Sequence, residues 1–148
     1  MTIINDVVDK VTVALYNEFG RDYTYYPEHI SQGFKTPCFM VTVLETFQTD
    51  YVGKRAKRTI PICINYVPVK DGYTKEMNDI SDRLFDCLEF IGEDGDMIRG
   101  LNARISFDAT GNLIFFIDYP ILIYKKRPDI EESMNQIGNA NIKTRGEN

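Results

Sequence analysis

One alternating stretch, residues 58–66, constrains the fold more than any other part of the chain. Apolar side chains occupy every second position, namely Ile60, Ile62, Ile64 and Tyr66. A period of two is typical of a β-strand with one buried face. A second β-prone stretch, 38–47, precedes it, and the polar, basic residues 48–57 lie between the two. The sequence therefore predicts two long strands joined by a basic loop, with the rest of the chain built around them.

Pro61 interrupts the second of these strands. Proline has no N–H to donate to a ladder, and within sheets it is confined to edge strands, strand starts and bulges. We therefore expect strand 58–66 to be an edge strand, or to carry a bulge at Pro61. An edge strand in the middle of a small protein would leave backbone groups available to a partner.

Two other stretches carry apolar residues at helical spacing. In 3–19 these residues recur every three or four positions, and Gly20 follows where a helix would end. In 74–91 the same spacing produces the apolar stripe Met77, Ile80, Leu84, Leu88 and Ile91. Both stretches are predicted to be amphipathic helices.

Three further stretches, 23–26, 97–107 and 113–124, have β character, and 108–112 with Gly111 reads as a hairpin turn. Both alternating faces of 113–124 contain apolar residues, which predicts a central strand covered on both sides. The order of elements predicts an α+β fold, with two helices packed on one face of a mainly antiparallel sheet of four to five strands. With 148 residues, we expect one domain over 1–127 and a polar C-terminal segment, 128–148, that is partly flexible or becomes ordered on assembly.

Composition and charge narrow the class of protein. A net charge of −5 argues against nucleic-acid binding through general electrostatics. The three cysteines, Cys38, Cys63 and Cys87, are far apart and read as small buried side chains in a reducing compartment. The chain opens with no signal-like segment and has no apolar run of the ~20 residues that a membrane span needs, so we expect a cytosolic protein that does not enter a membrane.

The search for chemistry finds no convergent motif. His29 is the single histidine, and no nucleophile-bearing turn accompanies it. Metal-binding spacings such as CxxC and HExxH are absent, as is a phosphate-binding glycine loop. The acidic run 93–96 lacks the spacing and the closing Glu of a calcium loop. The sequence therefore predicts no catalytic residues, no cofactor and no metal.

Surface contacts are the remaining candidates for function. Lys54, Arg55, Lys57 and Arg58 place four basic residues within five positions. They are either a solvated hairpin tip or a contact for an acidic partner surface or DNA. Among the tyrosines, Tyr25, Tyr26 and Tyr51 are candidate interface residues because tyrosine is enriched at interfaces, although ordinary strand aromatics would look the same.

The order of several short motifs resembles the tail terminator (tail completion) family of phages and phage-tail-like particles of Gram-positive bacteria. The resemblance covers roughly residues 3–125. The motifs are Val13-Ala14-Leu15, Phe19-Gly20, Tyr23, Tyr26, Ile30-Ser31-Gln32-Gly33-Phe34, Pro37-Cys38-Phe39, Arg58, the run 61–68, Arg99-Gly100 and the run 112–119.

This resemblance implies a structural subunit without catalysis. Such subunits form a ring, typically a hexamer, that caps the head-proximal end of the tail tube, stops its polymerisation and offers a surface to the head connector. The implied partners are further copies of the chain, the tail tube protein, and sheath and neck proteins, with DNA passing through the lumen without sequence-specific binding. The implied location is the host bacterial cytoplasm during assembly and then the virion or phage-tail-like particle.

Three alternatives remain open from the sequence. A head–tail joining protein of the neck shares this size and ring habit. An RNA- or ligand-binding α+β adaptor would need aromatic and basic residues together on one sheet face, whereas the alternation here groups most strand aromatics with the aliphatic core. A small enzyme would need the convergent polar motif that is missing.

Overall fold

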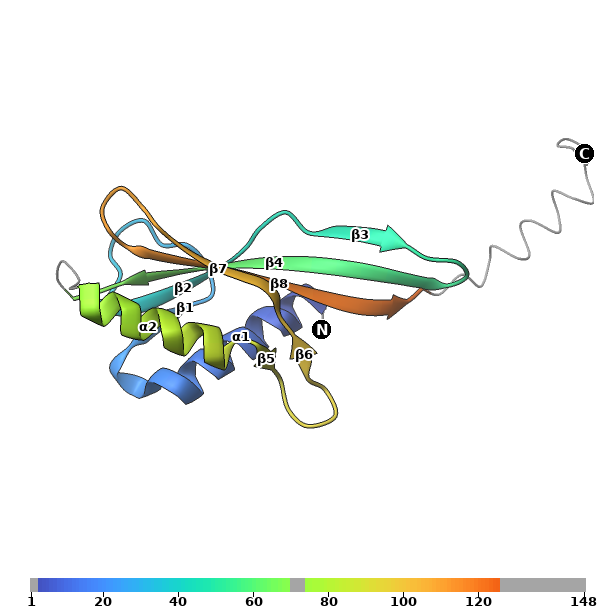
Figure 1. Cartoon of the computed structure of the whole chain (residues 1–148), viewed down its shortest axis with the longest axis horizontal. Coiled ribbons are helices and arrows are strands. Elements are labelled where there is room, and N and C mark those ends of the chain that lie inside the picture. Colours follow the sequence, from blue (N-terminus) through green and yellow to red (C-terminus); the bar gives the residue numbers. More distant parts are fainter. Residues whose placement is uncertain (1–2, 70–73, 126–148) are drawn as a thin grey trace, which may run out of the picture.

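The computed structural model describes residues 3–69 and 74–125, which form two helices, one short 3-10 turn and eight strands (Figure 1). In chain order these elements are α1 (Ile3–Phe19), η1 (Gly20–Asp22), β1 (Thr24–Tyr26), β2 (Cys38–Val43), β3 (Phe47–Asp50), β4 (Arg55–Val67), α2 (Thr74–Cys87), β5 (Phe90–Ile91), β6 (Ile98–Arg99), β7 (Leu101–Phe107) and β8 (Leu113–Tyr124).

The main sheet has six strands. Its order is β1-β2-β4-β8-β7, and β3 pairs with β4 as well; β5 and β6 form a separate two-stranded ladder. The α+β class is confirmed, but the sheet is mixed, because β1 runs parallel to β2 while the other pairs are antiparallel. A parallel pair needs a long crossover, and the stretch 27–37 supplies it. The main sheet has six strands, so the predicted count of four to five is too low.

β4 is a central strand, so the prediction of an edge strand at Pro61 is wrong. β8 pairs with β4 without a register shift from Arg55 to Tyr66, and β2 and β3 share the other side of β4. No bulge is present at Pro61 in the ladder between β4 and β8. The irregularity lies instead on the other side of β4, between β2 and β3.

The ladder that β2 and β3 form with β4 is interrupted opposite Pro61. The amide of Leu44 donates to the carbonyl of Pro61 at 2.9 Å, so the missing N–H of Pro61 faces Leu44 as well. The carbonyl of Leu44 instead accepts from the hydroxyl of Thr46 at 3.4 Å. For this reason the single strand predicted over 38–47 is two strands, β2 and β3, with 44–46 between them.

The basic stretch predicted to be a loop is largely strand. Gln48–Asp50 belongs to β3, and β4 begins at Arg55, so that only residues 51–54 form the turn. The register from Phe47↔Thr59 to Asp50↔Ala56 makes a tight hairpin. Loop residues were predicted here because glycine and charged residues dominate the composition, whereas pairing with β8 extends β4 by three residues.

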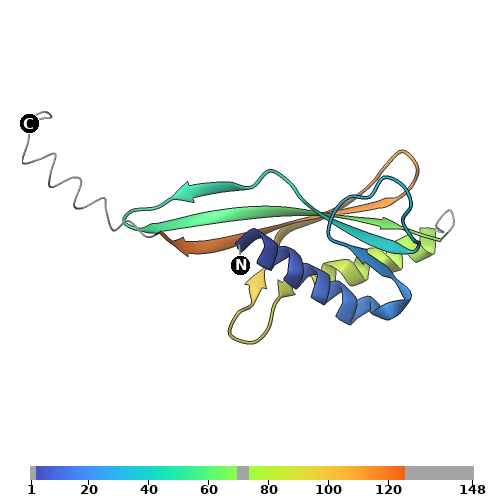
Figure 2. The ribbon, with the colours of Figure 1, turned by 180° about the vertical axis from the view of Figure 1, so that it is seen from behind.

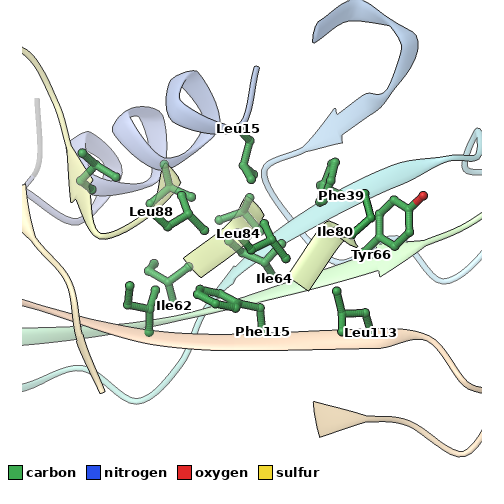
Figure 3. Packing of buried hydrophobic residues seen from close by; sticks show 14 of the residues in the cluster. Leu15, Phe39, Ile62, Ile64, Tyr66, Ile80, Leu84, Leu88, Leu113 and Phe115 are labelled. Atoms are coloured by element: carbon green, nitrogen blue, oxygen red, sulfur yellow. The ribbon is translucent and has the colours of Figure 1, made fainter. Parts of the chain in front are cut away.

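Both helices cover one face of the sheet (Figure 1). Their buried residues, among them Leu15 and Leu84, meet the inward side chains of β4 and β8, such as Ile64 and Phe115 (Figure 3). Both predicted helices are confirmed, but α2 ends at Cys87 rather than at 91. Beyond it the buried hydroxyl of Tyr119 donates to the carbonyl of Leu88 at 2.7 Å, which satisfies a carbonyl at the helix end.

The predicted central position of β8 is confirmed, since it lies between β4 and β7. Its inward residues Leu113, Phe115, Ile117 and Tyr119 are fully buried. Its outward residues are half-buried or exposed, with Leu122 at 57 % and Tyr124 at 72 % exposure. The prediction that both faces are covered is wrong, because both described helices pack on the same face.

Several other predictions concern single residues and segments. Cys38 and Cys63 are buried and Cys87 is half-buried, and all three are free thiols. In the turn 108–112, the carboxylate of Asp108 accepts from the amides of Thr110 and Asn112. Neither of the described helices has the length and apolarity needed to cross a membrane. The predicted polar segment 128–148 lies outside the described residues.

Gly100, between β6 and β7, lies so close to side chains of β8 that a larger residue would not fit without a shift. A Cβ at this position would overlap Cδ1 of Ile117 and lie 2.9 Å from Cε1 of Tyr119. We expect Gly100→Ala to lower the free energy of unfolding by about 1–3 kcal/mol through overpacking, measured by urea denaturation. Ile117→Val removes the overlapping methyl, so the double variant should lose less stability than the sum of the two single losses. An alanine variant as stable as the wild type would contradict this packing.

Candidate functional site

Three strands extend past the helical layer as a projecting arm (Figures 1 and 2). We define the arm as β3, the turn 51–54, and the paired segments 55–59 of β4 and 120–124 of β8. All four residues of β3 are exposed. The arm carries the four basic candidates and one of the three candidate tyrosines, so it is the site to which the sequence points.

Hydrogen bonds across the arm hold its strands together. The guanidinium Nε of Arg58 donates to Oε1 of Gln48 on β3 at 3.0 Å. At the tip, the amide of Lys125 donates to the carbonyl of Lys54 at 2.6 Å, and its ammonium pairs with Asp50 at 2.6 Å. Exposed ion pairs add at most about 1 kcal/mol, so the backbone ladder is the main stabilising contact of the arm.

The strand alternation divides the four basic residues between the two faces of the arm. Arg55 and Lys57 point to the face opposite the helices, whereas Arg58 points to the other face and Lys54 lies in the turn. Within the described part of the chain, none of the four forms an ion pair. Their positive charge is therefore available to a partner.

The candidate tyrosines do not gather in one place. Tyr51 lies on the arm and is 42 % exposed. Tyr25 lies in β1, where its ring stacks on Phe39 and its hydroxyl donates to the carbonyl of Gly20 at 2.6 Å; burial raises the pKa of this hydroxyl to about 12. Tyr26, also in β1, accepts from the amide of Lys35 at 2.9 Å.

Exposed apolar side chains on the arm were missed by the sequence analysis. They are Phe47 at 53 %, Val52 at 88 %, Leu122 at 57 % and Tyr124 at 72 % exposure. Val52 could have been noticed from the sequence, because it is an aliphatic residue directly before Gly53 in a stretch that was otherwise polar and was predicted to be a turn. Exposed apolar patches rimmed by polar residues mark interaction sites in soluble proteins, so the arm has the chemistry of a contact surface.

No described residues suggest catalytic or metal chemistry. His29 is exposed and lies in the loop between β1 and β2. In residues 3–69 and 74–125, no group of three or more His, Cys, Asp or Glu side chains is arranged to hold a metal ion.

A matched pair of tyrosine variants separates a structural hydroxyl from an exposed one. Tyr25→Phe removes the hydrogen bond to Gly20 and should lower the free energy of unfolding by about 0.5–1.5 kcal/mol. Tyr51→Phe removes a hydroxyl that makes no hydrogen bond with a described residue, and should change it by less than about 0.5 kcal/mol. Thermal denaturation measures both. Equal losses would mean that the Tyr25 hydroxyl is not structural.

Comparison with known proteins identifies the family. A family model described as phage tail terminator protein matches residues 6–131, which include almost all of α1 and every described strand. A search of curated protein sequences finds no match. The family is one of structural tail proteins and not of enzymes, which agrees with a site built for contact. The chain therefore belongs to the phage tail terminator protein family.

Proposed function

We propose that this protein forms a ring, typically of six subunits, that caps the head-proximal end of the tail tube. The ring ends polymerisation of the tube and provides the surface to which the head or neck attaches. Membership of the phage tail terminator family supports a structural role in the virion tail. The observation that carries the ring itself is the arm, which is left uncovered in the single subunit.

The arm is unlike the rest of the subunit surface. At its tip Val52 exposes 88 % of its surface, and Tyr124 exposes 72 %. Lys54, Arg55 and Lys57 lie beside these groups without ion pairs to described residues. Clustered apolar groups rimmed by charge mark contact sites in soluble proteins. A subunit that repeats around an axis would cover such an arm with its neighbour.

The capping mechanism that we propose is geometric. One face of the ring imitates the end of a tube ring and binds the tube, and the other face lacks this imitation, so no further tube subunit adds. The partners are thus further copies of the chain, the tail tube protein, and sheath or neck proteins. Assembly takes place in the host cytoplasm, and DNA passes through the lumen without sequence-specific recognition.

Reversal of the arm charges tests this function. With Lys54, Arg55, Lys57 and Arg58 all changed to Glu, we expect loss of capping, because a partner surface complementary to the basic arm would then meet like charges. Electron microscopy of tubes assembled with each protein measures the length distribution. Tubes capped by the wild type should be uniform, and tubes with the variant should be as long and variable as those assembled without the protein.

The control for this experiment is the reversal of exposed lysines outside the arm, Lys35→Glu with Lys75→Glu, which should leave tube length uniform. Tubes of normal length with all four arm charges reversed would contradict the role of the arm. Finished tails of normal length that fail to join heads, after deletion of the protein, would contradict termination and indicate a head–tail joining protein.

A further inference from the structure

A groove on the helical side of the subunit is complementary to the arm, because it combines acidic and apolar residues whereas the arm combines basic and apolar ones. It has a volume of about 550 Å³ and lies between α1 and the segment that contains β5 and the following turn. This volume falls within the range of about 300–1,000 Å³ of protein binding pockets. The groove is open to solvent in the single subunit, so it is available to an occupant.

The floor of the groove is apolar. Val13 on α1 is 57 % exposed, and Phe90 on β5 is 49 % exposed, although both line the same hollow. Ala14 and Cys87 continue this floor. Large apolar side chains left this exposed in a concave site favour an apolar occupant.

The rim of the groove is acidic. Five carboxylates and one lysine line it, namely Asp6, Asp9, Glu18, Glu93, Asp96 and Lys10. The lysine is already used, because its ammonium pairs with Asp6 and, at 2.8 Å, with Asp96. Arg83 pairs with Glu18 at 2.8 Å. Asp9 and Glu93 form no ion pair with a described residue, so they carry the negative charge that remains for a partner.

The tip of the arm presents the matching features. Val52 is the most exposed large apolar residue of the described chain, and Lys54 follows it two positions later in the same turn. Lys57 lies further along the arm on β4. The arm tip thus combines an exposed apolar residue with nearby lysines, and the groove combines an apolar floor with nearby carboxylates. The two surfaces are complementary in charge and in hydrophobicity.

The arm cannot reach the groove of its own subunit. Figures 1 and 2 place the arm tip at one end of the described part of the chain and the β5–β6 hairpin near its middle, below the sheet. Two complementary patches at different places on one chain produce a head-to-tail contact between copies, and such contacts close into rings when the rotation permits.

We propose that the arm tip of one subunit, with Val52, Lys54 and Lys57, docks into the groove of the next subunit between Val13 and Phe90, against Asp9 and Glu93. This inference rests on the proposed ring and names the two surfaces that close it. The carboxylates guide the arm and fix its register, and burial of Val52 against the apolar floor stabilises the contact.

Charge reversal on each side, and then on both sides of the same chain, tests this contact. The arm variant is Lys54→Glu with Lys57→Glu, and the groove variant is Asp9→Lys with Glu93→Lys. We expect each to weaken self-association by about tenfold or more, with the full chain measured by light scattering with and without tail tubes. The four reversals combined should restore the ring, because an acidic arm then meets a basic groove.

A matched control removes the effect of net charge. The arm variant combined with Glu28→Lys and Asp82→Lys has the same net charge as the four-reversal chain, but its new lysines lie at exposed positions outside the groove lining. This control should stay as weak as the arm variant alone. In addition, Val52→Asp should prevent ring formation, whereas Val69→Asp, at another exposed valine, should not.

The outcomes separate this contact from the ring itself. Wild-type rings together with unaffected arm and groove variants would overturn the docking contact and leave the ring proposal intact. A groove variant that fails while the arm variant assembles normally would assign the groove to another occupant, such as the tube protein, and would also overturn the contact. A four-reversal chain that stays as weak as the single variants would do the same. A wild-type chain that is monomeric even on tubes would overturn both proposals together.

Discussion

The pairing of β4 with β8 is the interaction on which the rest of the structure depends. Twelve consecutive residue pairs join them, from Arg55↔Tyr124 to Tyr66↔Leu113. At about 3.3 Å per residue a strand of this length extends about 40 Å, whereas α1, with 17 residues, is about 26 Å long at 1.5 Å per residue. The helices therefore cover only one part of the ladder, and the remainder must project as the arm.

Sequence patterns predicted the covered part of this ladder well. The apolar alternation of Ile60, Ile62 and Ile64 is imposed by the helical layer, so the buried face could be read directly. The same holds for the stripes of α1 and α2, which pack on that face. The projecting part was not predicted, because Ala56 is the one buried residue of Arg55–Arg58 and no apolar alternation marks this segment; its strand conformation comes from pairing with residues more than sixty positions away.

Pro61 shows why local rules failed at the centre of the sheet. The rule that proline avoids ladders was correct for the one hydrogen bond at stake, since the missing donor faces Leu44 at the break between β2 and β3. The sequence could not reveal that the interruption falls in the neighbouring chain segment at Leu44, because the residue that faces Pro61 depends on the register between two separate strands. The candidate site was affected too: the charges were found, but their division between two faces follows from the strand conformation of Arg55–Arg58, a stretch predicted to be mostly loop.

The break opposite Pro61 also bears on the assembly role proposed for the arm. β2 belongs to the helix-covered sheet, and β3 belongs to the arm, so the interruption at 44–46 lies at the boundary between the two. β4 and β8 cross this boundary without interruption. A continuous two-stranded ladder keeps the arm in a fixed direction relative to the core, and a contact surface in a fixed direction loses less conformational entropy on binding. A subunit of a closed ring requires such a fixed direction, because the angle between neighbouring copies determines whether the ring closes.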